Sequence, residues 1–403
     1  MTKRSILSCL AFFFIPILGF ASSFINICRR DVSKTDIFII SSFFFIIGYS
    51  VPPVYDLARH YSDFDSMVDF NSFYTLIEYK FDFILYTTEY VTKTLGLHFG
   101  IVPGAYSFIS YYIILSIYRF YTLKSQKMTS STYFLLSLLV LSTVPLFTII
   151  LGLRFGFGIF IALYASFLIF EKRNKIGYLF LILAMICHFA FLLLAIAFIL
   201  SKLVRVSKSL FIVLIIVAIS TSYLISNLIN IMPVPELLKG RLLAYLTGYW
   251  ATEFLDTYSL WYRVSLILTY WMIYPGVLYL FLINKNSYKD SYMQFTIWNI
   301  LILFLFCNYE VIFSRYAMFV NCMIILQFIK HYSSSCFKNT FLLIFTFVGL
   351  ITFAFGNIYA NRTVISLNNM TNILYLPPVI TIFERTQYDR KILSQIDEQG
   401  RFL

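Results

Sequence analysis

The sequence has little charge for its length. Asp, Glu, Lys and Arg make up 12% of its 403 residues, and the mean hydropathy is +0.81. A soluble domain carries about a quarter charged residues, so this composition excludes an ordinary soluble protein. Internal repeats and a separate hydrophilic domain are also missing. We expect an integral membrane protein built mainly from apolar segments of about 20 residues.

Metal-binding and disulfide patterns are absent as well. The six cysteines are scattered, with no CxxC pair and no Cys/His cluster, which argues against a zinc site or a disulfide framework. No DDxxD motif occurs, and Asp63–Phe64–Asp65 matches only the unspecific DxD spacing. We expect no cofactor. The formal charge is +12, but no loop holds a dense basic run, so we expect cytoplasmic anchoring rather than nucleic-acid binding.

Apolar runs separated by charged loops predict helices rather than a barrel, because barrel strands alternate polar and apolar residues. The predicted fold is all-α, a polytopic transmembrane bundle with about 11–13 membrane segments. Residues 1–23 have the pattern of a secretory signal peptide, but we favour a first transmembrane helix. The candidate spans are 5–28, 37–51, 99–118, 132–151, 153–170, 176–200, 210–232, 263–283, 291–308, 312–329 and 340–359.

The basic loops set the expected orientation, because positive loops stay in the cytoplasm. These loops lie near Arg29, Arg119, Lys172, Lys202, Lys285 and Lys330. The loops at Lys172 and Lys202 cannot both be cytoplasmic if segment 176–200 crosses once. We therefore predict a re-entrant hairpin at 176–200 that turns near His188. The alternative is one ordinary helix that violates the positive-inside rule.

With this orientation, loops 52–80 and 233–262 lie on the outer face of a transmembrane domain that covers 1–359, followed by a polar outer tail, 360–403. Segment 81–97 carries too many charges for a lipid-facing span and is predicted to be an interfacial amphipathic helix. In the alternative topology, the N-terminus is inside, 81–97 crosses the membrane and 52–80 is cytoplasmic.

Arginines at helix ends on the outer side are the main functional signal. Arginine offers a fork of donors that suits phosphate oxygens, so several of them would bind a lipid diphosphate without a metal. Asp56 or His188 would serve as the general base for an attacking hydroxyl. Each arginine taken alone also fits headgroup anchoring or a structural ion pair. The outward-facing candidates are Asp56, Arg59, Tyr61, Arg154, His188, Arg241, Arg263, Arg315 and Tyr316.

The aromatic residues have two readings. They make up 20% of the chain, and the stretch 245–262 is rich in Tyr and Trp. Sugar rings stack on such side chains, whereas an interfacial aromatic belt would explain most of them without any ligand.

The order of four motifs resembles the EpsG-like and Wzy-like polysaccharide polymerases of bacterial surface glycan clusters. The motifs are D-x-x-R-x-Y from Asp56, LRFGFGIFIALYA around Arg154, a histidine in an apolar run at His188, and SRYAMF around Arg315. In that family a helix begins with an Arg followed by small residues, and the next helix has a central His. Asp56, Arg59 and Tyr61 match the family's first external loop, and Arg315–Tyr316 its late Arg.

The resemblance implies a multi-pass, GT-C-like, metal-independent glycosyltransferase of the bacterial inner membrane. It would move a growing glycan from undecaprenyl diphosphate onto the next lipid-linked repeat unit, on the periplasmic or external face. The product would be O-antigen of lipopolysaccharide, capsule or exopolysaccharide. The implied partners are undecaprenyl-diphosphate-linked repeat units, membrane lipid, a chain-length regulator and a flippase.

Two other functions fit a cationic, many-helix membrane protein. A flippase or transporter of lipid-linked oligosaccharides would more often show internal repeats and short loops on both faces, and the sequence has neither. An O-acyltransferase is the third alternative, although no early Arg/His constellation points to it.

Overall fold

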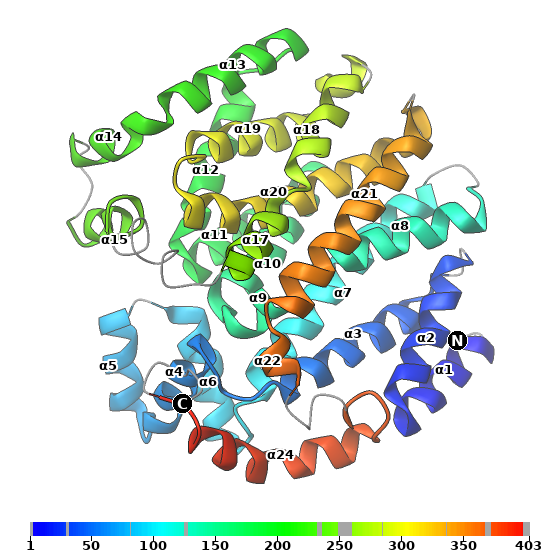
Figure 1. The fold of residues 1–403 in the computed structure, drawn as a ribbon, viewed down its shortest axis with the longest axis vertical. Helices are drawn as coiled ribbons and strands as arrows, with labels where there is room; N and C mark the ends of the chain where they lie inside the picture. The colour runs from blue at the N-terminus through cyan, green and yellow to red at the C-terminus, as the bar shows by residue number, and fades with distance from the viewer. Residues whose placement is uncertain are drawn as a thin grey trace. The chain divides into compact units, whose positions relative to one another are not determined.

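The structure, a computed structural model, is helical throughout the residues that it describes, with no β-strand among them (Figure 1). This confirms the all-α class. The described residues are 3–29, 32–80, 82–124, 128–231, 236–248, 260–283, 285–335, 337–366 and 372–397. The chain forms two compact units, which we call unit 1 (Met1–Ile169, Asn174–Phe189 and Asn361–Leu403) and unit 2 (Phe170–Arg173 and Ala190–Ala360).

Unit 1 holds the first eleven helices and the end of the chain, including most of the predicted tail. Its helices are α1 (Lys3–Phe14), α2 (Pro16–Cys28), α3 (Lys34–Ser50), α4 (Asp56–Ser66), α5 (Phe70–Lys80), α6 (Phe83–Thr94), α7 (Ile101–Lys124), α8 (Ser130–Thr143), α9 (Leu146–Leu151), α10 (Leu153–Phe170, the last residue in unit 2), α11 (Ile176–Cys187), α22 (Arg362–Ile365) and α24 (Pro378–Leu393). The pair α3 and α7 forms its most extensive helix–helix contact.

The predicted first span, 5–28, is wrong, because the chain breaks at Ile15 and forms two helices that pack on each other. Pro16 causes the break, since it has no N–H and is tolerated only in the first turn of a helix. Gly19 allows the close approach: a Cβ there would lie 2.4 Å from Cβ of Phe12. Each helix is only about 18–20 Å long, so neither alone crosses a bilayer core of about 30 Å.

The predicted interruption at His188 is confirmed. α11 ends at Cys187, His188 has extended backbone angles (φ −160°, ψ 131°), and a short 3₁₀ turn, η1 (Phe189–Phe191), follows. α11 packs antiparallel to α10, because Gly177 lies against Ile169 at one end and His188 against Phe155 at the other. The return of the chain to the cytoplasmic side after His188 stays a prediction.

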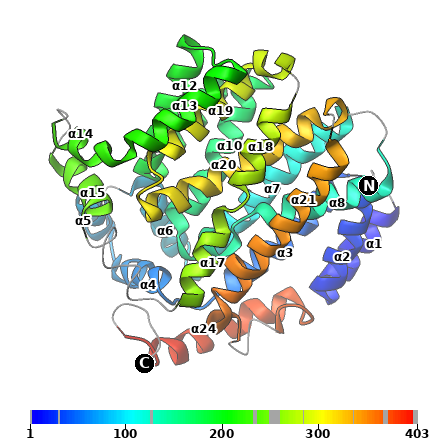
Figure 2. The same ribbon diagram turned by 45° about the horizontal axis from the view of Figure 1, so that its top comes forward.

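Unit 2 is built around α19 and α20. Its helices are α12 (Leu192–Leu203), α13 (Lys208–Thr221), α14 (Ile225–Ile231), α15 (Glu236–Leu246), α17 (Leu260–Tyr270), α18 (Ile273–Leu282), α19 (Ser291–Leu305), α20 (Glu310–His331) and α21 (Lys338–Thr352), with the 3₁₀ turns η2 (Ser222–Leu224), η3 (Lys285–Lys289) and η4 (Tyr332–Ser334) and the π-helical segment η5 (Phe353–Tyr359). α12 and α13 pack on α19, and α21 runs beside α17 and α18 (Figure 2).

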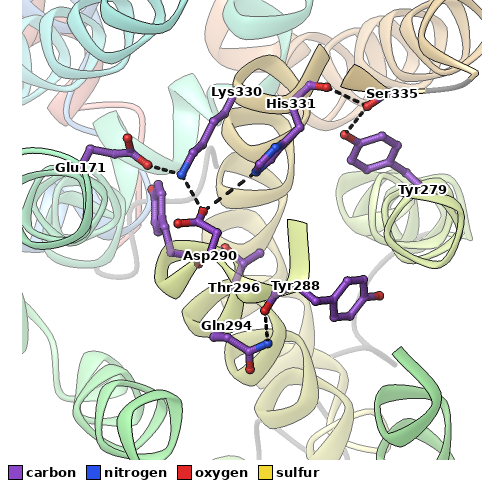
Figure 3. A network of polar contacts seen from close by, with 10 residues as sticks. Glu171, Tyr279, Tyr288, Asp290, Gln294, Thr296, Lys330, His331 and Ser335 are labelled. Carbon is purple, nitrogen blue, oxygen red and sulfur yellow. Dashed lines mark hydrogen bonds and ion pairs between the residues drawn. The ribbon is translucent and has the colours of Figure 1, made fainter. Parts of the chain in front are cut away.

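A cluster of charges joins three helix ends in unit 2 (Figure 3). Lys330, near the end of α20, bonds to Glu171 and, at 2.5 Å, to Oδ2 of Asp290, the N-cap of α19. Nε2 of His331 lies 3.9 Å from the same Asp290 oxygen. We call Lys330, Glu171 and Asp290 the lysine cluster. It fastens the four-residue segment Phe170–Arg173, whose flanking residues belong to unit 1.

Seven helical segments in the described ranges are long and apolar enough to cross a membrane. They are 101–124, 130–151, 153–170, 208–231, 263–282, 310–331 and 338–359. Four further apolar helices are shorter, namely 16–28, 176–187, 189–203 and 291–305. Together these eleven apolar helices of the described residues agree with the expected number of about 11–13 membrane segments, although the chain breaks some apolar runs into shorter pieces, as at Pro16 and His188.

Candidate active site

The polar side chains of unit 1 gather where α4 faces α6. Asp82 is the N-cap of α6, and Tyr86, Glu89 and Lys93 follow within that helix. Successive spacings of four, three and four residues place these four side chains on one face. That face is turned toward α4, as the contacts of its members show.

Three hydrogen bonds join the two helices. The hydroxyl of Tyr86 donates to Oδ2 of Asp63 at 2.8 Å. The ammonium of Lys93 donates to the carbonyls of Phe64 and Asp65 at 2.8 and 2.6 Å. Burial, and after it the charge of Asp63, raises the pKa of Tyr86, so the phenol stays protonated and remains the donor. These bonds hold α4 and α6 in one register.

The prediction for segment 81–97 is correct in one respect and wrong in another. α6 has 12 residues, about 18 Å, too short to span a bilayer core. An interfacial helix turns its charged face to water, but Glu89 is 0% exposed and Asp82 is 8% exposed. The acids of α6 therefore face protein, because Glu89 lies against His60 of α4 and Asp82 against Arg154 of α10.

Arg154 is held by a carboxylate from α6. It lies in the first turn of α10, and its Nη1 is 2.5 Å from Oδ2 of Asp82. The positive end of a helix dipole disfavours a cation there, and Asp82 offsets that cost. The charge of Asp56 also acts on Arg154.

The small residue that follows the arginine has a packing role. A Cβ on Gly156 would lie 2.4 Å from Cα of Ile149 and 2.4 Å from the carbonyl oxygen of Thr148. Only glycine therefore lets α9 fold back against the first turn of α10. The predicted start of a helix at the Arg–x–Gly sequence is confirmed, and its close packing positions Arg154.

Asp56 and Arg59 form an ion pair that water can reach. Oδ1 of Asp56, the first residue of α4, lies 2.8 Å from Nη2 of Arg59, and their side chains are 49% and 52% exposed. The preceding residue, Tyr55, has φ 52° and ψ −131°, a conformation that costs about 1–3 kcal/mol in a non-glycine residue. Tyr61 is half-buried, with its ring edge-on to Phe99 at 5.5 Å.

His188 lies at the same end of α10 as Arg154. Its ring meets Phe155 edge-on at a centroid distance of 5.4 Å and stacks on Phe189 at 4.7 Å. Unit 1 therefore brings together Asp56, Arg59, Arg154 and His188 near the start of α10.

The later arginines belong to unit 2, where their neighbours are different. Nη1 of Arg315 donates to the hydroxyl of Tyr245 at 3.1 Å, and the guanidinium carbon lies 5.5 Å from the centre of that ring. The charge of Arg263 acts on Glu310, the first residue of α20.

Tyr316 faces the interior of unit 2. It is 1% exposed, and its hydroxyl donates to Oδ1 of Asn299 at 2.5 Å. In this conformation the phenol offers no open face to a sugar. Arg241 lies on α15, but its side chain is outside the described residues, as are Tyr249, Trp250 and Tyr258 of the predicted aromatic loop. Convergence of all the arginines on one site stays a prediction.

The described residues contain no group of three His, Cys, Asp or Glu side chains placed to hold a metal ion. In the DxD stretch, the carboxylate of Asp63 accepts from Tyr86, and the carbonyl of Asp65 accepts from Lys93. Both residues thus contribute to the contact between α4 and α6.

Sequence reasoning missed Asp82, Tyr86 and Glu89 on α6 and did not use His60 of α4. His60 and Glu89 are 2% and 0% exposed, and Nδ1 of His60 lies 3.9 Å from Oε1 of Glu89. The 4–3–4 spacing along α6 was visible in the sequence and indicates one polar face. What covers that face was not visible.

Comparison with known families places the chain. No curated protein and no solved structure is significantly similar to it. The model of the EpsG family matches residues 33–377, nearly the whole chain. This range includes every described helix of the candidate site. The described residues also contain seven helices that are long and apolar enough to cross a membrane. The chain therefore belongs to the EpsG family and is a multi-pass membrane protein of the polysaccharide polymerase type.

Proposed function

We propose that the protein is a glycosyltransferase of the bacterial inner membrane that polymerises undecaprenyl-diphosphate-linked repeat units on the periplasmic or external face. Membership of the EpsG family supports the polymerase type. The observation that carries the proposal is the Arg154–Asp82 pair in the first turn of α10, with the charge of Asp56 acting on the same arginine.

Arg154 and Arg59 bind the diphosphate of the donor lipid. A guanidinium has five N–H donors, and the contact with Asp82 uses the Nη1 end of Arg154. The remaining donors, together with the backbone N–H groups in the first turn of α10, face the charge that develops on the leaving diphosphate. Such electrostatic stabilisation needs no metal. Asp82 acts as a positioning residue, since it fixes the guanidinium.

Asp56 is the general base in this proposal. Its side chain is half-exposed and lies 2.8 Å from Nη2 of Arg59. As the acceptor hydroxyl attacks the anomeric carbon, Asp56 takes the hydroxyl proton and the bond to the diphosphate oxygen breaks. His188 is the rival base, and its ring lies against Phe155 and Phe189.

The remaining candidates bind the substrates. Both lipid-linked substrates carry a diphosphate, so Arg241, Arg263 and Arg315 are assigned to the second one. Tyr61, at the edge of α4, is assigned to a sugar ring. Tyr316 enters the proposal only as a packing neighbour of Arg315, because it is buried. A chain-length regulator and a flippase are the proposed protein partners.

Gene deletion with gel analysis of surface glycan tests the proposal. A polymerase mutant accumulates single-repeat products at the surface, whereas a flippase mutant loses surface glycan and traps lipid-linked units inside. Complementation with Arg154→Lys should leave single repeats. Arg119→Lys is the matched control, because Arg119 of unit 1 donates from Nε to the backbone carbonyl of Val32 at 2.6 Å and has no proposed role; it should restore long chains.

A further inference from the structure

His60 and Glu89 form a fully buried histidine–carboxylate pair in unit 1. They come from facing helices, α4 and α6, and Nδ1 of His60 lies 3.9 Å from Oε1 of Glu89. Their side chains are 2% and 0% exposed. Burying an ionisable pair is expensive, and within a membrane protein such residues commonly belong to proton pathways.

The pair lies next to the proposed base. Asp56 and His60 are four residues apart on α4, so their side chains occupy neighbouring positions on one face of the helix. Asp56 is half-exposed and His60 is buried. The face therefore runs from a carboxylate that a substrate can reach to an imidazole that it cannot.

A second histidine–carboxylate pair in unit 1 provides the contrast. Nε2 of His98 lies 3.0 Å from Oδ2 of Asp389, while its Nδ1 accepts the backbone N–H of Gly100 at 3.0 Å. Nδ1 of His98 must therefore be unprotonated, and the ring is fixed as the neutral tautomer that donates from Nε2. This pair fastens α24 and has no geometry for taking up a proton at Nδ1.

The His60–Glu89 pair is more widely separated than the His98–Asp389 pair. At 3.9 Å the two atoms are beyond hydrogen-bond length. A protonated imidazole and a carboxylate normally approach to about 2.7–2.9 Å. Proton uptake by His60 would therefore draw the pair together, and the negative charge of Glu89 favours that uptake.

We propose that His60 and Glu89 act as a buried proton store behind Asp56, an inference that rests on the proposed function. The acceptor oxygen bonds to the anomeric carbon, the bond to the diphosphate breaks with its electron pair on the phosphate oxygen, and the proton passes from the hydroxyl to Asp56 and then to His60. Glu89 stabilises the imidazolium. Transfer to His60 leaves Asp56 ionised again, and release of the proton from His60 returns the neutral imidazole before the next transfer.

Other charged or titratable groups surround the path and set its electrostatics. They are Asp56, Arg59 and Asp63 on α4, Asp82, Tyr86 and Lys93 on α6, Tyr106 on α7 and Arg154 on α10.

The test is the pH–kcat profile of purified protein with lipid-linked repeat units. His60→Gln keeps a hydrogen-bonding amide but cannot carry the proton. It should lower kcat by about a hundredfold or more, with KM nearly unchanged, and should lose the part of the acidic limb that depends on His60. Glu89→Gln should move that limb to lower pH, and Glu89→Asp should restore it in part. The matched control, His98→Gln, should keep the limb.

Near-normal kcat with an intact acidic limb in His60→Gln would overturn the inference. If wild-type protein itself forms no polymer, the proposed function fails instead, and the two failures are thus distinguished. A second measurement needs no activity. The chain has four histidines, so ¹⁵N NMR titration of His98→Gln, His188→Gln and His331→Gln assigns the fourth signal to His60. That signal should titrate, and Glu89→Gln should lower its midpoint; a signal that does not titrate contradicts the proposal.

Discussion

The arginines of the proposed site have different partners in the two units. In unit 1, Arg154 lies against Asp82 and Arg59 against Asp56, so each cation has a carboxylate. In unit 2, Arg315 lies against the hydroxyl and ring of Tyr245, a neutral partner. A carboxylate fixes an arginine and also offers a proton acceptor, whereas a neutral phenol accepts a hydrogen bond from the guanidinium and carries no negative charge. In the proposed mechanism, this difference fits acid–base chemistry at Asp56 in unit 1 and anion holding at Arg315 in unit 2.

The largest effect should come from removing the base of unit 1. Asp56→Asn keeps the shape of the side chain but cannot accept the proton, so polymerisation should fall by about a hundred- to ten-thousandfold. His188→Ala should leave a weaker but measurable activity, because its ring is packed between two phenylalanines. A purified assay with lipid-linked repeats measures both. If His188→Ala is inactive and Asp56→Asn is nearly normal, His188 is the general base and Asp56 is not.

Arginine-to-lysine changes in the two units should follow next. Lysine is a point charge without a fork, so Arg154→Lys and Arg315→Lys should each lose most of the glycan chain length while protein still accumulates in the membrane. Arg154→Lys should mainly lower kcat, since it loses the alignment that Asp82 provides. Arg315→Lys should mainly raise KM. Full-length glycan from both variants would show that these arginines only anchor the protein to lipid headgroups and do not bind the diphosphate.

The lysine cluster of unit 2 should affect stability more than chemistry. Lys330→Met leaves Glu171 and Asp290, which are 10% and 30% exposed, without the cation between them. Leaving carboxylates unpaired should lower the free energy of unfolding by about 2–4 kcal/mol. Thermal unfolding in detergent measures this. Lys338→Met is the control, because Lys338 is exposed at the start of α21. If both variants lose the same free energy of unfolding, the lysine cluster has no special role in stability.

A smaller effect should come from the phenol beside Arg315. Tyr245→Phe keeps the ring under the guanidinium and removes only the hydroxyl that accepts from Nη1. Loss of one such hydrogen bond is worth about 0.5–1.5 kcal/mol, so KM should rise by about two- to tenfold at constant kcat. A change in kcat alone would break the assignment of anion holding to unit 2.

Topology labelling decides which face of the membrane the site occupies. Single cysteines at Asp63 and Glu253 should react with impermeant reagents from outside, and cysteines at Lys124, Lys202 and Lys285 should react only from inside. Glu253 lies outside the described residues. Labelling at Lys202 only from outside would contradict the prediction that the chain returns to the cytoplasmic side after His188.

Local chemistry explains which predictions succeeded. The break at His188 was predicted from the parity of basic loops, and the start of α10 from an arginine followed by small residues. Pro16 could have been recognised as a break, because proline begins helices and interrupts them. The partner of Arg154 could not be predicted from the sequence, since Asp82 is 72 residues away along the chain. A sequence pattern identifies a polar face but not the helix that covers it.

The chain order of unit 1 has a consequence for its synthesis. Residues 361–397 return to the segments made first: the backbone N–H of Ile17 donates to Leu374, the hydroxyl of Tyr49 to the carbonyl of Ile382, and His98 pairs with Asp389. These contacts cannot form until the ribosome has translated the residues after Asn361, which follow unit 2 in the chain. The first segments of unit 1 are thus made before unit 2 but packed only after it, and a chain truncated before Asn361 would leave the insertion machinery with an unclosed unit 1.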